Sequence, residues 1–450
     1  MPLNNRDLVG KVKPGVKSFT FYIYPYWIEF KKKANINIIA LYVTMAALLI
    51  HNVCADEYHY NNMLIGDRAS GLAGAYSAIS DDPSGLFYNP AGIVYATTSN
   101  ISANMNAYNV SQIRYKNVLG KQDWVRTSAA LVPNFFGITQ PLGSGTFGFS
   151  YAVTDSILED QDQTFNDIPS AGTKFTMNFN NQTTANNIGP SYAIAINDKF
   201  SFGLTLYGYH RTQEKIVSQS FDFPDTDTGD IYHWESVYVS VSEYGVNPIL
   251  GFMLTPIEKV SLGLTLSKTL LLHSSTKAQL SCATSFIDEA TTGAVCQPNS
   301  YNRIELANSD KRKFPFTVNL GAAYFASKTL MFSSSIWIYE AIHSNKSPMA
   351  NIAAGLEYYL DSRFAVRMGG YTNFANTPKL TENAINEYNE HIDIFGGTIS
   401  LTHFTRTSSI TFGAASTYGK GQAQVVDGNT KIQDVEYIGA SIFISASNSF

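Results

Sequence analysis

The stretch VSLGLTL, Val260 to Leu266, alternates strictly between aliphatic residues and small or polar ones. Because successive side chains of a β-strand point to opposite faces, this pattern predicts a strand with one aliphatic face and one small, polar face. The stretches 147–153, 200–206 and 314–321 repeat the alternation. A half-buried strand of a soluble sandwich would alternate in the same way, so the number of strands and the lengths of their connections must decide the class.

The same period continues from residue 98 to the C-terminus and predicts about 14 strands, an even number. They lie near 98–109, 123–139, 145–154, 184–197, 200–212, 233–255, 258–270, 312–326, 329–340, 350–360, 363–371, 391–403, 407–417 and 435–448.

The connections between these strands alternate in length. Tight turns are expected at 141–145, 198–199, 256–259, 327–328, 361–362 and around Thr405. Longer polar loops are expected at 110–122, 155–183, 213–232, 271–311, 341–349, 372–390 and 418–434. Outer-membrane barrels show this alternation, with short periplasmic turns and long outer loops, whereas a sandwich has no reason to sort its loops. The sequence therefore predicts an all-β fold, an antiparallel transmembrane β-barrel over 98–450 with both termini on the periplasmic side.

Composition agrees with a barrel and argues against a helical membrane protein. Only 15% of the residues are charged, 13% are aromatic, and the mean hydropathy is near zero. After the first 55 residues the sequence has no apolar run of about 20 residues, the length that a spanning helix requires. The chain ends on Phe450 after an alternating segment, which resembles the terminal strand recognised by the barrel-assembly machinery, although Asn448 departs from that pattern.

Residues 1–55 are interpreted as an N-terminal extension followed by a cleaved signal peptide. Lys31 to Lys33 precede an apolar run from Ile36 to Ile50, and small residues allow cleavage after Ala55. The run is short for a membrane anchor, and acylation of Cys54 is disfavoured by the bulky or polar residues before it. Without this leader the chain has 24 basic and 34 acidic residues. No basic stripe remains for nucleic acid, so that partner class is excluded.

Two cysteines, Cys282 and Cys296, remain after the leader. They are 14 residues apart in a polar segment, which predicts a disulfide in an exported protein. A metal site would need further ligands, and no Cys or His lies nearby at ligand spacing.

The stretch IGDRASGLAGAYSAISDDPSGLFYNPAG, Ile65 to Gly92, lies between the leader and the first strand. Its spacing predicts an amphipathic helix over 69–79, a turn capped by Asp82 before Pro83, and an extended Asn89. A barrel of about 14 strands is too wide for its own side chains to fill. We therefore expect residues 56–97 to plug the lumen.

This stretch resembles the N-terminal hatch of the FadL/OmpP1/TodX family of outer-membrane long-chain fatty acid and hydrophobic-compound transporters. The matching elements are Gly71 to Tyr76, Asp81-Asp82 and Asn89-Pro90-Ala91-Gly92, and the segment 131–134 and the C-terminal strand extend the resemblance. The resemblance implies a 14-stranded barrel plugged by the hatch. It also implies passive uptake of hydrophobic molecules such as long-chain fatty acids, which would leave sideways through a gap beside an inward kink in the third strand.

The resemblance assigns candidate roles to individual residues. The hatch and gating residues would be Asp67, Arg68, Tyr76, Asp81, Asp82, Asn89 and Pro90. Gly148 would permit the wall kink, although glycine in a barrel strand commonly only makes room.

Other residues are candidates for contact with a ligand. Arg363 and Arg367 share the polar parity of their strand, where they would meet a ligand carboxylate or pair with hatch acids such as Asp67. Trp337, Tyr339 and Phe443 would line an apolar pocket or belong to an interfacial girdle.

An enzyme is not expected. The adjacent carboxylates Asp81 and Asp82 rarely aim at one point, the histidines are scattered, and no G-x-S-x-G occurs. We expect no cofactor and no metal.

Two functions stay open. The first is passive, hatch-gated transport of a hydrophobic compound with lateral exit, and the second is a non-transport barrel that serves as an adhesin or a secretion partner. In either case we expect a monomer in the outer membrane of a Gram-negative bacterium. It would be surrounded by membrane lipid and lipopolysaccharide and inserted by the barrel-assembly machinery.

Overall fold

The fold is seen in a computed structural model. It describes residues 58–60, 62–96, 98–119, 121–166, 174–223, 231–285, 301–342, 346–384, 386, 390–425 and 431–450. The expected leader and Cys296 lie outside these residues.

Sixteen strands form one antiparallel sheet in the described residues. They are β1 Asn100–Leu119, β2 Gln122–Leu142, β3 Gly145–Phe165, β4 Lys174–Asn197, β5 Phe200–Phe223, β6 Ile231–Ile257, β7 Val260–Ser267, β8 Leu270–Thr284, β9 Tyr301–Asn308, β10 Thr317–Phe325, β11 Leu330–Tyr339, β12 Met349–Tyr359, β13 Phe364–Asn373, β14 Glu390–Phe404, β15 Ser408–Ala423 and β16 Gln433–Ser449.

Fourteen of these strands close into a barrel, which confirms the predicted all-β fold. The ring runs from β1 to β7 and from β10 to β16, and β1 pairs with β16 along its length. The remaining two strands, β8 and β9, continue the sheet beyond the upper half of β6. The predicted strands at 258–270 and 312–326 correspond to β7 and β10.

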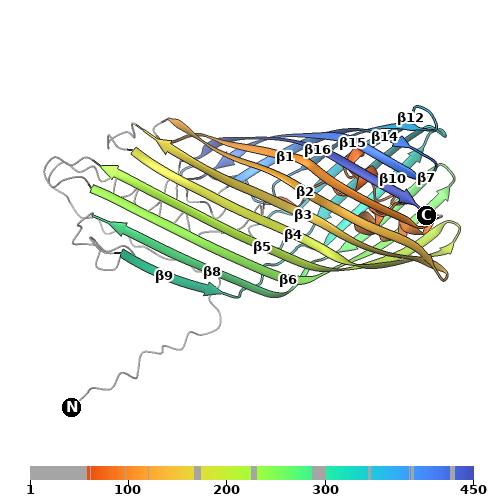
Figure 1. Cartoon of the computed structure of the whole chain (residues 1–450), viewed down its shortest axis with the longest axis horizontal. Coiled ribbons are helices and arrows are strands. Elements are labelled where there is room, and N and C mark those ends of the chain that lie inside the picture. The colour runs from red at the N-terminus through yellow and green to blue at the C-terminus, as the bar shows by residue number, and fades with distance from the viewer. Residues whose placement is uncertain are drawn as a thin grey trace, which may run out of the picture.

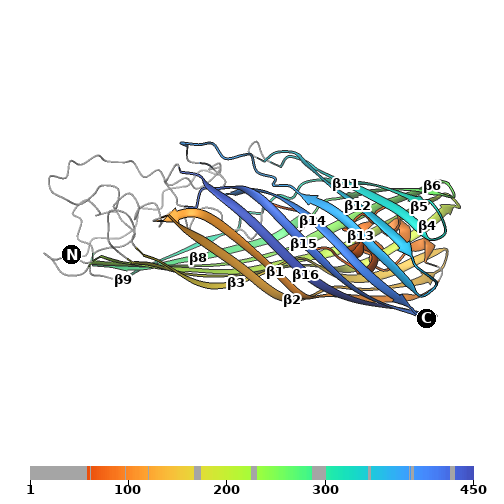
Figure 2. The ribbon, with the colours of Figure 1, turned by 90° about the horizontal axis from the view of Figure 1, so that it is seen from above.

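The two ends of the barrel differ (Figure 1). The short turns, the C-terminus and the N-terminal helical segments lie at one end, and the strands β3 to β6 and β8 reach far beyond β10 to β14 at the other end (Figures 1 and 2). A barrel strand needs about 9–11 residues to cross a bilayer. β10 to β13 have 9 to 11 residues, whereas β4 to β6 have 24 to 27, so β4 to β6 are more than twice as long as a bilayer crossing requires.

The outer face of the barrel is apolar at the level of the short strands. Ten neighbouring strands each present a large side chain that is 37% to 58% exposed: Leu204, Leu250, Leu262, Leu320, Phe332, Ile352, Met368, Ile399, Phe412 and Ile442. Soluble proteins rarely expose contiguous apolar surface of this extent, so lipid is the medium that this face requires. Among the described residues no helix is long and apolar enough to span a membrane.

The N-terminal residues 62–96, here called the hatch, lie inside the barrel at the end that carries the turns. They contain α2 (Asp67–Gly71), α3 (Gly85–Tyr88) and the 3₁₀ helix η1 (Pro90–Tyr95). The helix predicted over 69–79 is wrong in extent, since α2 ends at Gly71. Ala73 and Gly74 have φ of 56° and 83°, values that an α-helix cannot include.

Glycines on the lumenal face of seven strands make room for the hatch. A Cβ at any of them would lie 2.2 to 2.9 Å from a hatch atom: Gly148, Gly203, Gly251, Gly263, Gly321, Gly355 and Gly369. Gly148, Gly203, Gly263 and Gly321 occupy the small, polar parity that the alternation predicted. At all seven positions the hatch packs directly against the strands.

Candidate functional site: a lumenal cavity beside a break in the wall

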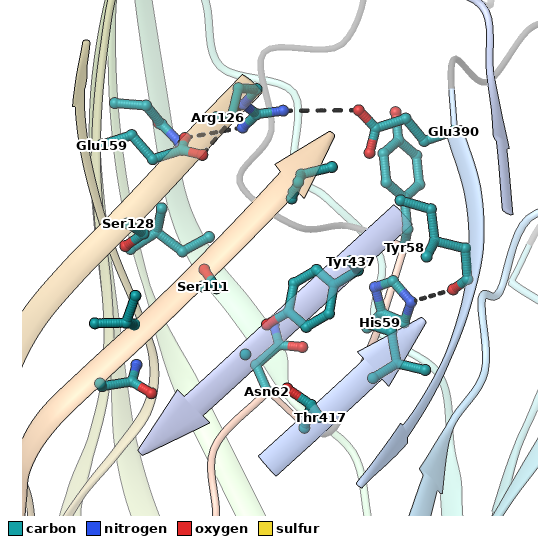
Figure 3. Close-up of a pocket in the computed structure, with 18 of the residues that line it drawn as sticks. Tyr58, His59, Asn62, Ser111, Arg126, Ser128, Glu159, Glu390, Thr417 and Tyr437 are labelled. Atoms are coloured by element: carbon teal, nitrogen blue, oxygen red, sulfur yellow. Dashed lines mark hydrogen bonds and ion pairs between the residues drawn. The ribbon is translucent and has the colours of Figure 1, made fainter. Parts of the chain in front are cut away.

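A cavity of about 290 Å³ lies in the lumen above the hatch. Strands β1 to β5 form one side of it, β13 to β16 form the other, and the hatch residues 62–64 border it from below. Tyr58 and His59 project into the same space (Figure 3), and the ring Nε2 of His59 lies 2.7 Å from the carbonyl oxygen of Ile392. The N-terminal part of the described chain is therefore a wall of the cavity.

An ionic cluster centred on Arg126 occupies the polar side of the cavity (Figure 3). Its Nη2 lies 2.8 Å from Oε2 of Glu159, and its Nη1 lies 3.6 Å from Oε1 of Glu390. The same Nη1 donates to the hydroxyl of Tyr115 at 2.9 Å, and that hydroxyl donates to Glu390. Two carboxylates therefore share one guanidinium.

Aromatic and aliphatic side chains cover the rest of the cavity. Trp124 stacks on Tyr115 with ring centroids 4.8 Å apart, and Phe179 lies 4.8 Å under the guanidinium carbon of Arg126. Ile392, Ile394 and Tyr437 face them from the opposite wall. Such a mixture of apolar surface with a few placed polar groups is typical of a small-molecule site.

The wall of the barrel is interrupted beside this cavity. The ladder between β2 and β3 runs from Leu142 and Gly145 to Phe135 and Ala152. Beyond that point only Ser128 and Glu159 pair, so 122–127, 129–134, 153–158 and 160–165 have no ladder partners across this seam. A register shift between Val153 and Asp155 on the β4 side marks the same place. Ser128, Ser156 and Ile157 line the cavity, so the break adjoins it directly.

The break lies away from Gly148, the residue predicted to permit a kink. Gly148 pairs with Thr139 on one side and with Ser191 on the other. A Cβ there would lie 2.3 Å from Leu86, so this glycine accommodates the hatch. The irregularity is instead five to seven residues further along β3, at Val153 to Asp155, immediately above the hatch contacts of Phe135 and Ala152.

A buried ionic network joins the hatch to the wall. Arg68 donates to both oxygens of Asp81, at 2.8 and 2.9 Å, and its Nε donates to Oε1 of Glu357 at 3.0 Å. The Nε of Arg367 donates to the same Glu357 oxygen at 2.7 Å, and its Nη1 lies 3.8 Å from Asp67. Of the two alternatives for Arg367, the structure places it with the hatch acids and away from the cavity.

The other predicted gating residues organise the hatch itself. Tyr76 donates to Asp81 at 3.0 Å, and Oδ1 of Asp82 accepts from the backbone N–H of Ser84 at 2.8 Å. Asn89 is extended, with φ of −159°, and precedes Pro90 at the start of η1. Its Nδ2 donates to the carbonyl of Ser77 at 2.7 Å and to that of Phe252, in β6, at 3.0 Å.

The remaining residues predicted to contact a ligand lie in different parts of the barrel. Arg363 is exposed in the turn before β13, so its expected lumenal position is wrong. Trp337 packs against the hatch core, and Tyr339 stacks on Tyr60 at 4.6 Å, so both face inward toward the N-terminal segment. Phe443 is buried and lines the cavity.

Cys282 is disulfide-bonded, and its predicted partner Cys296 lies outside the described residues. Among the residues that the structure describes, no group of three or more His, Cys, Asp or Glu side chains is arranged to hold a metal ion.

The residues that build the cavity were not apparent from the sequence. Arg126 and Glu159 lie on the consecutive strands β2 and β3, but Glu390 comes from β14, and only the closed barrel brings it to Arg126. One local signal was present, because charged residues in a barrel strand of alternating pattern belong on the lumenal parity.

Solved structures with this fold are known. A FadL homologue of Pseudomonas aeruginosa aligns over 87% of this chain and 100% of its own, with a TM-score of 0.61 and 15% identity. The P. putida toluene transporter TodX aligns over 87% of this chain and 99% of its own, with a TM-score of 0.57 and 14% identity. The Ralstonia pickettii toluene transporter TbuX aligns over 87% of this chain and 99% of its own, with a TM-score of 0.56 and 11% identity. No family model and no curated protein matches the sequence. The chain has the plugged-barrel fold of these transporters.

Proposed function

We propose that this chain is a FadL-type transporter that carries hydrophobic compounds passively across the outer membrane of a Gram-negative bacterium. Its solved neighbours are described as a FadL homologue and as toluene transporters, which supports transport of a hydrophobic small molecule. Long-chain fatty acids, the ligand class that the sequence resemblance implies, are the first candidates within this class.

The observation that carries the proposal is the contact between the cavity and the break in the wall. Ser156 and Ile157 line the cavity and belong to the part of β3 that has no ladder partner in β2. On the outer surface the same break is bordered by Leu131 and Leu158, which are 63% and 42% exposed. The seam thus offers a hydrophobic molecule in the cavity a sideways route to the lipid, with Leu131 and Leu158 at its outer edge.

The hatch acts in this account as a floor that diverts the ligand. Its backbone fills the notches left by the wall glycines, and its charges are paired with wall residues. Because the break opens directly above it, a ligand can leave without removal of the hatch. The gating roles of Asp67, Arg68, Tyr76, Asp81, Asp82, Asn89 and Pro90 therefore consist of holding this floor in place.

Uptake by whole cells tests the proposal. The chain would be expressed in a strain that lacks its own hydrophobic-compound uptake, and accumulation of a radiolabelled long-chain fatty acid and of toluene would be measured. We expect uptake of at least one of them, reduced at least tenfold by Ser156→Trp, which fills the break. Ser334→Trp is the matched control. Ser334 lies in β11, where it pairs with Ala322 of β10 and with Ala354 of β12, so the ladder has no break there.

A surface-assembled chain that takes up neither compound contradicts the proposal. Equal uptake by Ser156→Trp and by Ser334→Trp contradicts the lateral route alone.

A further inference from the structure

We infer that the cavity selects ligands with an uncharged, oxygen-bearing head group on a hydrophobic body and discriminates against a carboxylate. Protonated acids, alcohols, ketones and esters share this chemistry, so a long-chain fatty acid would occupy the cavity as the neutral acid and not as the carboxylate. The inference rests on the proposed function and narrows its substrate class.

The charges around the cavity disfavour a ligand carboxylate. Among the described residues that line it, Arg126 and Lys215 are cationic, whereas Asp155, Glu159 and Glu390 are anionic. The guanidinium of Arg126 is held by Glu159 through paired contacts at 3.1 and 2.8 Å and faces Glu390 from its other edge. A ligand carboxylate that approached Arg126 would meet two carboxylates already there, and like charges at such distances repel strongly when water is excluded.

A further buried acid adds to the excess of negative charge around the cavity. Glu235, in β6, is completely buried and pairs in the ladder with Gln219, a cavity residue. Neither of its carboxylate oxygens has a hydrogen-bond partner, and its Oε2 lies 3.6 Å from the ring Nε2 of His233, which is charged only when protonated. The outer end of the cavity therefore has no surplus of positive charge among the described residues.

Two unpaired hydrogen-bond donors belong to residues that line the cavity. The indole Nε1 of Trp124 and the amide Nε2 of Gln219 are buried atoms without a hydrogen-bond partner, and both residues line the cavity. Gln219 is only 3% exposed. Buried donors are costly when unpaired, so each favours a ligand atom that accepts a hydrogen bond. A neutral oxygen satisfies them without adding a negative charge.

Calorimetric binding to the full chain in lipid nanodiscs tests this inference. Four probes with one ten-carbon chain would be compared at pH 7.5, with empty nanodiscs as background: 1-decanol, decanoate, decylamine and decane. We expect 1-decanol to bind at least tenfold more tightly than decanoate and decylamine, and more tightly than decane.

Variants assign the effect to the cavity. Gln219→Leu and Trp124→Phe remove a donor each and should weaken 1-decanol several-fold while leaving decane unchanged. Glu390→Gln and Glu159→Gln remove one carboxylate each and should strengthen decanoate several-fold. Glu305→Gln is the matched control, because Glu305 is exposed on β9 and pairs with Arg303.

The outcomes separate the two proposals. Decanoate or decylamine binding as tightly as 1-decanol overturns the head-group inference and leaves the transporter proposal standing. Decane binding as tightly as 1-decanol overturns the role of the donors. If none of the four probes binds, both the transporter proposal and the head-group inference are overturned.

Discussion

Arg68 of the hatch and Glu357 of β12 form the central ion pair between plug and wall. The Nε of Arg68 lies 3.0 Å from one carboxylate oxygen and 3.1 Å from the other, and the side chain of Glu357 is completely buried. Arg367 holds the same carboxylate from the wall, so Glu357 bridges two guanidinium groups that would otherwise lie close together. Glu357 is thus the acidic side chain through which the wall pairs with Arg68 of the hatch.

Replacing that side chain by its amide should loosen the hatch. Glu357→Gln leaves Arg68 with Asp81 and leaves Arg367 without its closest carboxylate. Breaking a buried ion pair in this way costs about 3–5 kcal/mol. We expect hydrogen exchange of the hatch backbone, residues 62–80, to accelerate strongly while the barrel strands keep their protection. Glu305→Gln on β9 is the control, and equal exchange in the two variants would show that Glu357 does not hold the hatch.

Adding a methyl group to the wall should displace the hatch by a different mechanism. In Gly263→Ala the new Cβ would lie 2.2 Å from the carbonyl oxygen of Ser77, closer than any real contact, and overpacking of this kind costs about 1–3 kcal/mol. In the control Gly370→Ala the nearest atom is a backbone oxygen at 3.6 Å, an ordinary distance. We expect larger ion leakage through planar bilayers for the first variant only. Equal leakage by both variants would count against direct packing of the hatch on the strands.

The hatch should also respond to pH through Asp82, which lies outside the membrane-spanning strands. Burial, together with the neighbouring charge of Asp81, raises the pKa of Asp82 from its ordinary value to about 6, and the bond from Ser84 opposes this in part. A raised pKa means that the seated hatch binds a proton more readily than the released one. The hatch is therefore most firmly seated at acidic pH and is loosened as the pH rises through 6.

Hydrogen exchange of residues 78–88 measured at pH 5 and at pH 7.5, corrected for intrinsic rates, checks this prediction. We expect less protection at the higher pH in the wild-type chain and a weaker dependence in Asp82→Asn, which keeps an oxygen acceptor for Ser84. Asp67, Arg68 and Asp81 are the other charged groups around Asp82, and their contribution persists in the variant. An identical pH dependence in the two chains would exclude Asp82 as its source.

Much of the barrel was predictable because the alternation of residues along each strand is a local feature of the sequence. In VSLGLTL, Val260 to Leu266, the period of two fixes which face meets lipid, and Gly263 lies on the lumenal face as that pattern requires. The hatch was less predictable. The helix spacing of Leu72, Tyr76 and Ile79 suggested one helix, but Leu72 and Tyr76 instead pack into the hatch core from an irregular segment. Close packing against the wall outweighed the local preference there.

The site could not be predicted, because its parts lie in different strands and meet only after closure. Arg126 and Glu390 are 264 positions apart, yet they face each other across the cavity. The break in β3 was expected at a glycine, where backbone freedom is greatest. It begins instead at Val153 to Asp155, and farther along the same seam side-chain amides take the place of the ladder: Oε1 of Gln163 accepts from the backbone N–H of Val125 at 3.1 Å.

Photoaffinity labelling tests the central claim most directly, namely that a hydrophobic ligand occupies the cavity and leaves through the break between β2 and β3. A long-chain alcohol with a terminal diazirine would be incubated with cells that express the chain, irradiated, and mapped by peptide mass spectrometry. We predict labels on the residues between cavity and lipid, 128–134 and 153–158, which excess unlabelled ligand removes. Labels confined to the lipid-facing residues of β10 to β16, unchanged by competitor, would contradict the account.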